Sequence, residues 1–258
     1  MVTAAVEAGR AECEIYAGAF KVHHKEDASP VTAADHAAEA IILEHLARVA
    51  PGIPVVAEES VAAGRIPRVG KEFILVDPLD GTKEFIAKRG DFTVNIALIR
   101  DGAPVLGVVF APANSQLFVG DVESGKAFRS AQKPDPAHSA PLEGIRVRTP
   151  PARGLTAVAS RSHSNADTDN YLARNNVVDR VSVGSSLKFC LVAAGEADVY
   201  PRLGPTMEWD TAAGHAVLAA AGGKVTTLEN APLQYGKPQF RNPSFIASGL
   251  VPHLSHKA

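Results

Sequence analysis

Residues 73 to 82 read Phe73-Ile74-Leu75-Val76-Asp77-Pro78-Leu79-Asp80-Gly81-Thr82. The apolar run predicts a buried strand, and the carboxylates that follow it predict an acidic end. Pro78 stiffens the bend, and Gly81 permits close approach of the backbone. If a helix begins near Thr82, its free N–H groups face the same point and favour an anion. Since carboxylates bind Mg²⁺ and Mg²⁺ binds phosphate, the segment favours a metal and phosphate site over an ordinary surface turn.

Two further acidic segments fit the same scheme. Glu58-Glu59 ends the short strand predicted over Pro54 to Ala57, and its carboxylates can project from a neighbouring strand end. Asp210 precedes an apolar helix predicted over Thr211 to Ala221. Taken alone, Asp210 is explained as the N-cap of that helix.

The first part of the chain combines helices and strands. A helix is predicted over residues 3 to 22, with Val22 on its apolar side. Thr32 is expected to cap a second helix, whose apolar side carries Ile41, Ile42, Leu46 and Val49. Strands are then predicted at Val94 to Ile99, Val105 to Phe110 and Gln116 to Val119.

The second part alternates between strands and helices. The loop Gln132 to Pro141 leads into predicted strands at Thr156 to Ala159 and Val181 to Val183, and a helix is predicted over Ser186 to Ala194. The order of elements predicts an α/β protein with an N-terminal α+β half, residues 1–140, and a C-terminal α/β half, residues 141–258. The first half carries most of the candidate metal ligands, and the second carries the substrate contacts and the last ligand.

Composition narrows the function further. The 258 residues carry a formal net charge of −2 and no basic stripe, which argues against a nucleic-acid polymer as partner. The two cysteines, Cys13 and Cys190, form neither a disulfide framework nor a metal motif, and Cys190 is expected to be a small buried side chain. No signal peptide or transmembrane segment is predicted, so a cytoplasmic setting is expected, with peripheral association at the inner membrane left open.

The acidic segments together resemble the signatures of a known family. Ala57-Glu58-Glu59-Ser60, Asp77-Pro78-Leu79-Asp80-Gly81-Thr82 and Trp209-Asp210-Thr211-Ala212-Ala213 are similar to those of the lithium-sensitive inositol monophosphatase superfamily. The continuation Thr82-Lys83-Glu84-Phe85-Ile86 resembles the 3′(2′),5′-bisphosphate nucleotidase branch, whereas inositol monophosphatases usually carry T-x-N-F there. The resemblance implies the layered α-β-α-β-α sandwich of the inositol monophosphatase and fructose-1,6-bisphosphatase type.

The resemblance also implies a metal centre and a catalytic pair. Two or three Mg²⁺ ions would be bound by Glu58, Asp77, Asp80, Asp210 and the carbonyl oxygen of Leu79, an all-oxygen set that suits Mg²⁺ better than Zn²⁺. Asp35 and Thr82 match the pair that activates water, with Asp35 accepting the proton and Thr82 orienting it. Asp35 is also explained as a favourable acid in the first turn of a helix, and only the motif context favours the catalytic role.

The implied substrate is adenosine 3′,5′-bisphosphate, hydrolysed to AMP and phosphate. The substrate contacts expected for it are Gly81, Thr82, Ser160, His163, Gly184, Ser185, Lys188 and Asp210. His163 and Lys188 have ordinary structural explanations as well, and Arg202 is a weaker candidate that we leave out of the set. The family resemblance is compatible with a homodimer. The alternatives are an inositol monophosphatase or a related small-molecule phosphatase, and a protein that binds nucleotide or metal as a sensor.

Overall fold

The computed structural model describes residues 1–24, 30–159, 166–252 and 254. Its largest sheet has seven strands, which adjoin in chain order and are antiparallel except for the first pair. They are β3 (Val55–Ala57), β4 (Glu72–Asp80), β5 (Thr93–Arg100), β6 (Ala103–Ala111), β7 (Gln116–Asp121), β8 (Lys126–Ser130) and β9 (Glu143–Ile145). The apolar run before Asp77 is therefore a buried strand, as the sequence predicts, and it has a neighbour on each side.

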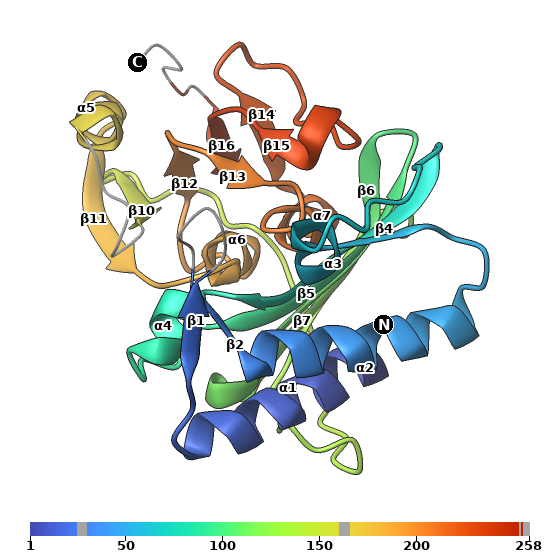
Figure 1. Ribbon diagram of the computed structural model, residues 1–258. Helices are drawn as coiled ribbons and strands as arrows, with labels where there is room; N and C mark the ends of the chain where they lie inside the picture. The colour runs from blue at the N-terminus through green and yellow to red at the C-terminus, as the bar shows by residue number, and fades with distance from the viewer. Residues whose placement is uncertain (25–29, 160–165, 253, 255–258) are drawn as a thin grey trace.

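Two long helices, α1 (Val2–Ala17) and α2 (Ala33–Val49), cover one face of this sheet (Figure 1). The predicted N-cap at Thr32 is confirmed, and Ile42 and Leu46 are buried against the strands. Two details of the prediction are wrong. The first helix ends before Gly18, whose backbone is extended, so Val22 lies in β1 (Val22–His24), which pairs with β2 (Pro30–Thr32). Val49 is the last residue of its helix and is 66% exposed.

The opposite face of the sheet is covered by α6 (Leu187–Ala193) and α7 (Ala212–Ala220). Glycines let α7 approach closely: a Cβ on Gly107 of β6 would lie 2.5 Å from the carbonyl oxygen of Ala213, and one on Gly120 of β7 would lie 2.5 Å from the Cα of Val217. Cys190 lies fully buried in α6, as expected for a small apolar side chain.

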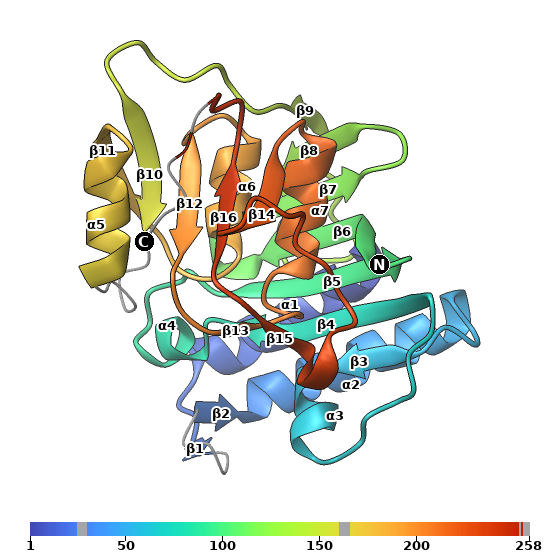
Figure 2. The ribbon, with the colours of Figure 1, turned by 90° about the horizontal axis from the view of Figure 1, so that it is seen from above.

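A second sheet of five strands lies beyond these helices, and α5 (Ala166–Arg174) packs on its outer face (Figure 2). Its strands are β10 (Leu155–Ala159), β11 (Val177–Ser182), β12 (Val199–Arg202), β14 (Lys224–Thr227) and β16 (Phe245–Ser248). The spatial order is β11-β10-β12-β16-β14, with parallel pairing only among the first three. The layers run helix, sheet, helix, sheet, helix, so the predicted five-layer sandwich is confirmed.

The remaining elements are short. They are α3 (Glu58–Ala62), α4 (Thr82–Ile86), the strand pair β13 (Thr206–Met207) and β15 (Arg241–Asn242), and the 3-10 turns Pro112–Asn114 and Pro238–Phe240. β9 pairs with β8 and so extends the N-terminal sheet past residue 140. Across the ranges described above, no helix is both long enough and apolar enough to cross a membrane.

Candidate active site

Three carboxylates from distant parts of the chain meet at one end of the large sheet. Glu58 begins α3 directly after β3, Asp77 lies near the end of the parallel neighbour β4, and Asp210 lies just before α7. One carboxylate oxygen of each can be chosen so that all three lie within 4.8 Å of one another. Asp80 lies three residues after Asp77, beyond an irregularity in the pairing of β4 with β5. The structure therefore brings Glu58, Asp77 and Asp210 together in one cluster.

The cluster is electrostatically unfavourable without a cation. Burial raises the pKa of Asp80 to about 6 against the opposing charge of Lys188, and the charge of Glu58 contributes to the increase. Burial also raises the pKa of Asp210 well above its usual range, with the charges of Asp80 and Glu58 adding to the shift. Carboxylates held this close repel one another, so a divalent cation between them would stabilise their ionised forms. The donors are hard oxygens only, and such a set fits Mg²⁺.

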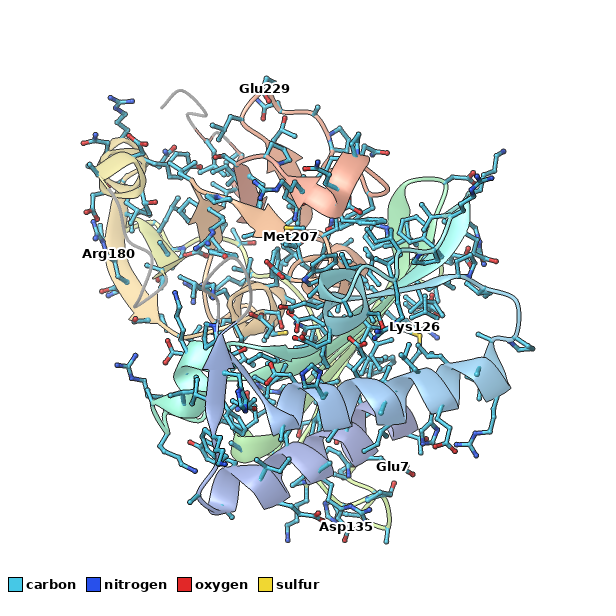
Figure 3. The ribbon with its side chains drawn as sticks, viewed as in Figure 1. Glu7, Lys126, Asp135, Arg180, Met207 and Glu229 are labelled. Carbon is cyan, nitrogen blue, oxygen red and sulfur yellow. The ribbon has the colours of Figure 1, made fainter. Side chains whose placement is uncertain are left out.

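Asp210 is held in this cluster by its own loop. The Met207 N–H donates to Asp210 Oδ2 at 2.8 Å, and the residue at the N-cap position of α7 is Thr211. Met207 is labelled in Figure 3, near the middle of the molecule. The simple explanation of Asp210 as an N-cap is therefore wrong, because Thr211 holds that position, while the Asp210 carboxylate closes the preceding turn and the residue lines the pocket.

The predicted catalytic pair is brought together. Asp35 Oδ2 accepts hydrogen bonds from the Thr32 N–H and the Thr32 hydroxyl, both at 2.8 Å, in a capping box at the start of α2. Asp35 Oδ1 lies 3.3 Å from the Thr82 hydroxyl, which is also 3.3 Å from the Leu79 carbonyl oxygen. Burial raises the pKa of Asp35, the bonds from Thr32 lower it, and Glu58 raises it. One oxygen of Asp35 therefore takes part in the helix cap and the other faces Thr82, so the two explanations of Asp35 are compatible.

The loop that carries Thr82 is fixed from both sides. Gly81 has φ +95°, which favours glycine, and a Cβ there would also lie only 3.1 Å from the Asp91 carbonyl oxygen. Phe85 of α4 packs against Phe92 and against Tyr16 of α1, with ring centroids 4.9 and 5.0 Å apart. These contacts hold the first turn of α4 against the end of β4.

The acids open into a pocket of about 240 Å³. Glu58, Asp80 and Asp210 line one part of it, and Gly184, Ser185 and Lys188 line another. Lys188 Nζ donates to the Ser185 carbonyl oxygen at 2.5 Å and lies 5.4 Å from the ring centroid of Tyr200. Burial lowers the pKa of Lys188 to about 8, and the nearby charge of Asp80 works against this shift. A buried cation therefore lies in the same pocket as the acids.

Most of the predicted substrate contacts share this pocket. Its lining includes Gly81, Thr82, Gly184, Ser185, Lys188 and Asp210. Ser160 and His163 lie outside the described residues. Asp77 and Leu79 lie behind the lining, where the Leu79 N–H donates to Asp77 Oδ1 at 3.0 Å.

Arg202 is a pocket residue that the sequence prediction left out. It lines the pocket at the end of β12, and its NH2 donates to the Pro205 carbonyl oxygen at 3.1 Å. Its Nε is buried and has no hydrogen-bond partner within the described part of the chain. In the sequence, the only feature that singled out Arg202 was its position after Tyr200-Pro201. Its place in the pocket depends on the pairing of β12 with other strands, which is a tertiary feature.

Comparisons with known proteins agree with this site. Residues 1–256 match the inositol monophosphatase family. A 3′(2′),5′-bisphosphate nucleotidase CysQ from Escherichia coli O157:H7 is 46% identical over 244 residues, covering 93% of this chain and 95% of that protein. The crystal structure of CysQ from Bacteroides thetaiotaomicron superposes with a TM-score of 0.81 at 38% identity, covering 96% of this chain and 95% of that one.

A layered fold in which three chain segments gather carboxylates at a pocket that also holds cations defines a class of metal-dependent phosphatases. The chain belongs to the inositol monophosphatase family. Within the family it is similar to the nucleotidases named CysQ, as Lys83-Glu84-Phe85 predicts. It is less similar to an inositol monophosphatase from Anabaena, which superposes with a TM-score of 0.73 at 28% identity, covering 95% of this chain and 87% of that one.

Proposed function

We propose that this chain hydrolyses adenosine 3′,5′-bisphosphate to AMP and phosphate in a Mg²⁺-dependent reaction. The observation that carries the proposal is a single pocket lined by the carboxylates, by the buried cation Lys188 and by the half-buried cation Arg202. A monophosphate would use the acids and their metals alone, whereas a bisphosphate also brings a second anion that the cations can receive. The identity to proteins named as 3′(2′),5′-bisphosphate nucleotidases supports this substrate class.

The metal site is proposed from the donor set. Glu58, Asp77, Asp80, Asp210 and the Leu79 carbonyl oxygen would hold two or three Mg²⁺ ions, which when bound supply Lewis-acid polarisation of the phosphoryl group and acidification of water. These side chains also bring their own charge to the site. Because these carboxylates are negatively charged, they attract the ions and repel a phosphate that carries no metal. We therefore expect the metal to bind before the substrate or together with it.

We propose that Asp35 accepts the proton of the attacking water and that Thr82 orients this water. The Thr82 hydroxyl can donate to Asp35 Oδ1, and its lone pairs then accept from a water placed between the pair and the phosphorus. Asp35 is anchored by Thr32 through its other oxygen, so the oxygen that faces Thr82 keeps its position. Water attacks phosphorus in line with the departing ribose oxygen, and no covalent enzyme intermediate forms.

The remaining pocket residues are proposed to bind the nucleotide. Lys188 and Arg202 would receive the phosphate that does not react, while Gly184 and Ser185 would offer backbone and hydroxyl groups beside it. Ser160 and His163 stay proposals that rest on the resemblance. The homodimer, the cytoplasmic location and the division near residue 140 also stay proposals, and light scattering after size-exclusion chromatography would test the first of these.

The test compares phosphate release from adenosine 3′,5′-bisphosphate, inositol 1-phosphate and adenosine 3′-monophosphate, each with Mg²⁺ and with excess chelator. We expect the bisphosphate to give the highest kcat/KM and all activity to stop in chelator. The Asp80→Asn variant should keep the fold and lose several kcal/mol of transition-state stabilisation, roughly a thousandfold in rate. A preference for inositol 1-phosphate would replace the proposed substrate, and tight nucleotide binding without turnover would indicate a sensor.

A further inference from the structure

A buried glutamate outside the predicted site contacts the segment that carries a metal ligand. Glu39 lies on α2 and is 4% exposed. Its Oε2 accepts a hydrogen bond from the Glu59 N–H at 2.8 Å, and its Oε1 accepts one from the Ser60 hydroxyl at 2.6 Å. Both oxygens of one buried carboxylate are therefore committed to consecutive residues of α3, immediately after Glu58.

This contact replaces a cap that α3 lacks. The N-cap residue of α3 is Ala57, which has no polar side chain, and the helix is only five residues long. Backbone N–H groups in a first turn need an acceptor, and one of them finds it in Glu39. Without Glu39, the Glu59 N–H would lose a charge-assisted hydrogen bond in a buried position, and the direction of the Glu58 side chain would be less fixed.

Helix α2 thereby connects two parts of the active site. Asp35 and Glu39 are four residues apart and lie on the same face of the helix. Asp35 reaches Thr82 at the end of β4, and Glu39 reaches α3 at the end of β3. The capping box at Thr32 fixes the start of α2, so both carboxylates are held by one rigid element.

We infer that Glu39 is a positioning residue for the metal ligand Glu58, and that Mg²⁺ affinity depends on it although it does not line the pocket. The inference rests on the proposed metal site. A carboxylate that orients a metal ligand from behind typically contributes 10-fold to 100-fold in metal affinity or activity. We therefore expect Glu39→Ala to weaken Mg²⁺ binding by about that factor. Glu39→Gln should have a smaller effect, since its amide oxygen can still accept one of the two hydrogen bonds.

The experiment measures Mg²⁺ binding by titration calorimetry and, separately, the Mg²⁺ concentration that half-saturates phosphate release. Glu44→Ala is the matched control, because Glu44 is exposed on the same helix. Melting in excess chelator reports the fold without metal. We expect Glu39→Ala to fold, to bind Mg²⁺ about 10-fold to 100-fold more weakly and to regain much of its rate at high Mg²⁺, whereas Glu44→Ala should behave as the parent.

Ser60→Ala tests the same contact if Glu39→Ala does not fold. It removes one hydrogen bond from the Glu39 carboxylate and should weaken Mg²⁺ binding about twofold to tenfold. An unchanged Mg²⁺ affinity in folded Glu39→Ala, or in Ser60→Ala and Glu39→Gln, would overturn the inference, and a lower melting temperature with unchanged affinity would make Glu39 merely structural. A parent chain that binds Mg²⁺ but fails to hydrolyse the bisphosphate would overturn the proposed function alone.

Discussion

Lys188 and Arg202 are cations that line the same pocket as the carboxylates of Glu58, Asp80 and Asp210, and this gives each a measurable role. Arg202→Ala and Lys188→Ala should each lower kcat/KM for adenosine 3′,5′-bisphosphate about tenfold to a hundredfold more than for adenosine 3′-monophosphate, because the charge is used only when a second phosphate is present. The ratio of the kcat/KM values for the two substrates cancels the effect that the charge of Lys188 also has on the pKa of Asp80. Lys224→Ala, at an exposed position, is the control. Equal losses on both substrates would assign these cations to the metal site or to the fold.

Glu12 is a second residue whose environment predicts a clear outcome. It is fully buried in α1, and neither carboxylate oxygen has a hydrogen-bond partner among the residues that the structure describes. Burial, and then the charge of Asp35, raise the pKa of Glu12 well above its usual range. Glu12→Leu should therefore stabilise the fold by about 1–3 kcal/mol, because an unsatisfied buried group is removed.

The gain from Glu12→Leu should depend on pH. The folded chain binds the Glu12 proton more tightly than the unfolded chain, so the cost of keeping Glu12 buried grows as pH rises above its ordinary pKa. The increase in melting temperature should be larger at about pH 8 than at about pH 5. Glu14→Leu, exposed on the same helix, should change stability by less than about 0.5 kcal/mol. A lower melting temperature for Glu12→Leu would mean that Glu12 has a stabilising partner.

At the scale of elements, the packing of α7 on β6 and β7 positions Asp210. A Cβ on Gly120 would lie 2.5 Å from the Cα of Val217 and 2.7 Å from the Ala216 carbonyl oxygen. Both are backbone atoms of α7, so no change of rotamer relieves the contact. Gly120→Ala should cost about 1–3 kcal/mol of stability and weaken Mg²⁺ binding, because α7 must shift together with the residue before it. The control is Gly144→Ala, because a Cβ at position 144 would have no atom within 4 Å. Full Mg²⁺ affinity in a destabilised Gly120→Ala would show that Asp210 is held by its own loop alone.

At the scale of the whole molecule, the site carboxylates Asp80 and Asp210 should lower stability as pH rises when Mg²⁺ is absent. A carboxyl whose pKa is raised on folding binds its proton more tightly in the folded chain, so the free energy of unfolding falls as the pH rises past the ordinary pKa. For Asp80 this loss develops from about pH 4 and is complete above about pH 6, and Asp210, whose pKa is also raised, adds a loss of the same sign.

Mg²⁺ should reverse this trend, because it binds the ionised carboxylates. The Mg²⁺-induced increase in melting temperature should grow with pH, and a concentration of 100 times Kd adds about 2.7 kcal/mol. Melting curves at several pH values, with chelator or with Mg²⁺, measure both effects. Asp80→Asn should flatten the pH dependence in chelator. A Mg²⁺ shift that is the same at all pH values would contradict the role of these carboxylates as ligands.

The sequence by itself determined the elements and the acids of the site. β4 is found from an apolar run, the start of α2 from Thr32, and the acidic cluster from residues next to strand or helix ends. These features depend on neighbours a few residues away, through backbone geometry, capping and alternation. The family resemblance then placed Asp35 with Thr82, which lie 47 residues apart and meet through the packing of α2 against β4.

Only the tertiary structure decided how the site is supported. The bond from Met207 to Asp210, the inward position of Arg202, the contact of Glu39 with α3 and the burial of Glu12 depend on which elements pack together. A polar residue on a helix has the same local pattern whether it faces solvent or a neighbouring helix N-terminus. Burial and partner choice are set by long-range packing, so the residues that contact the proposed metal ligands became visible only in the folded chain.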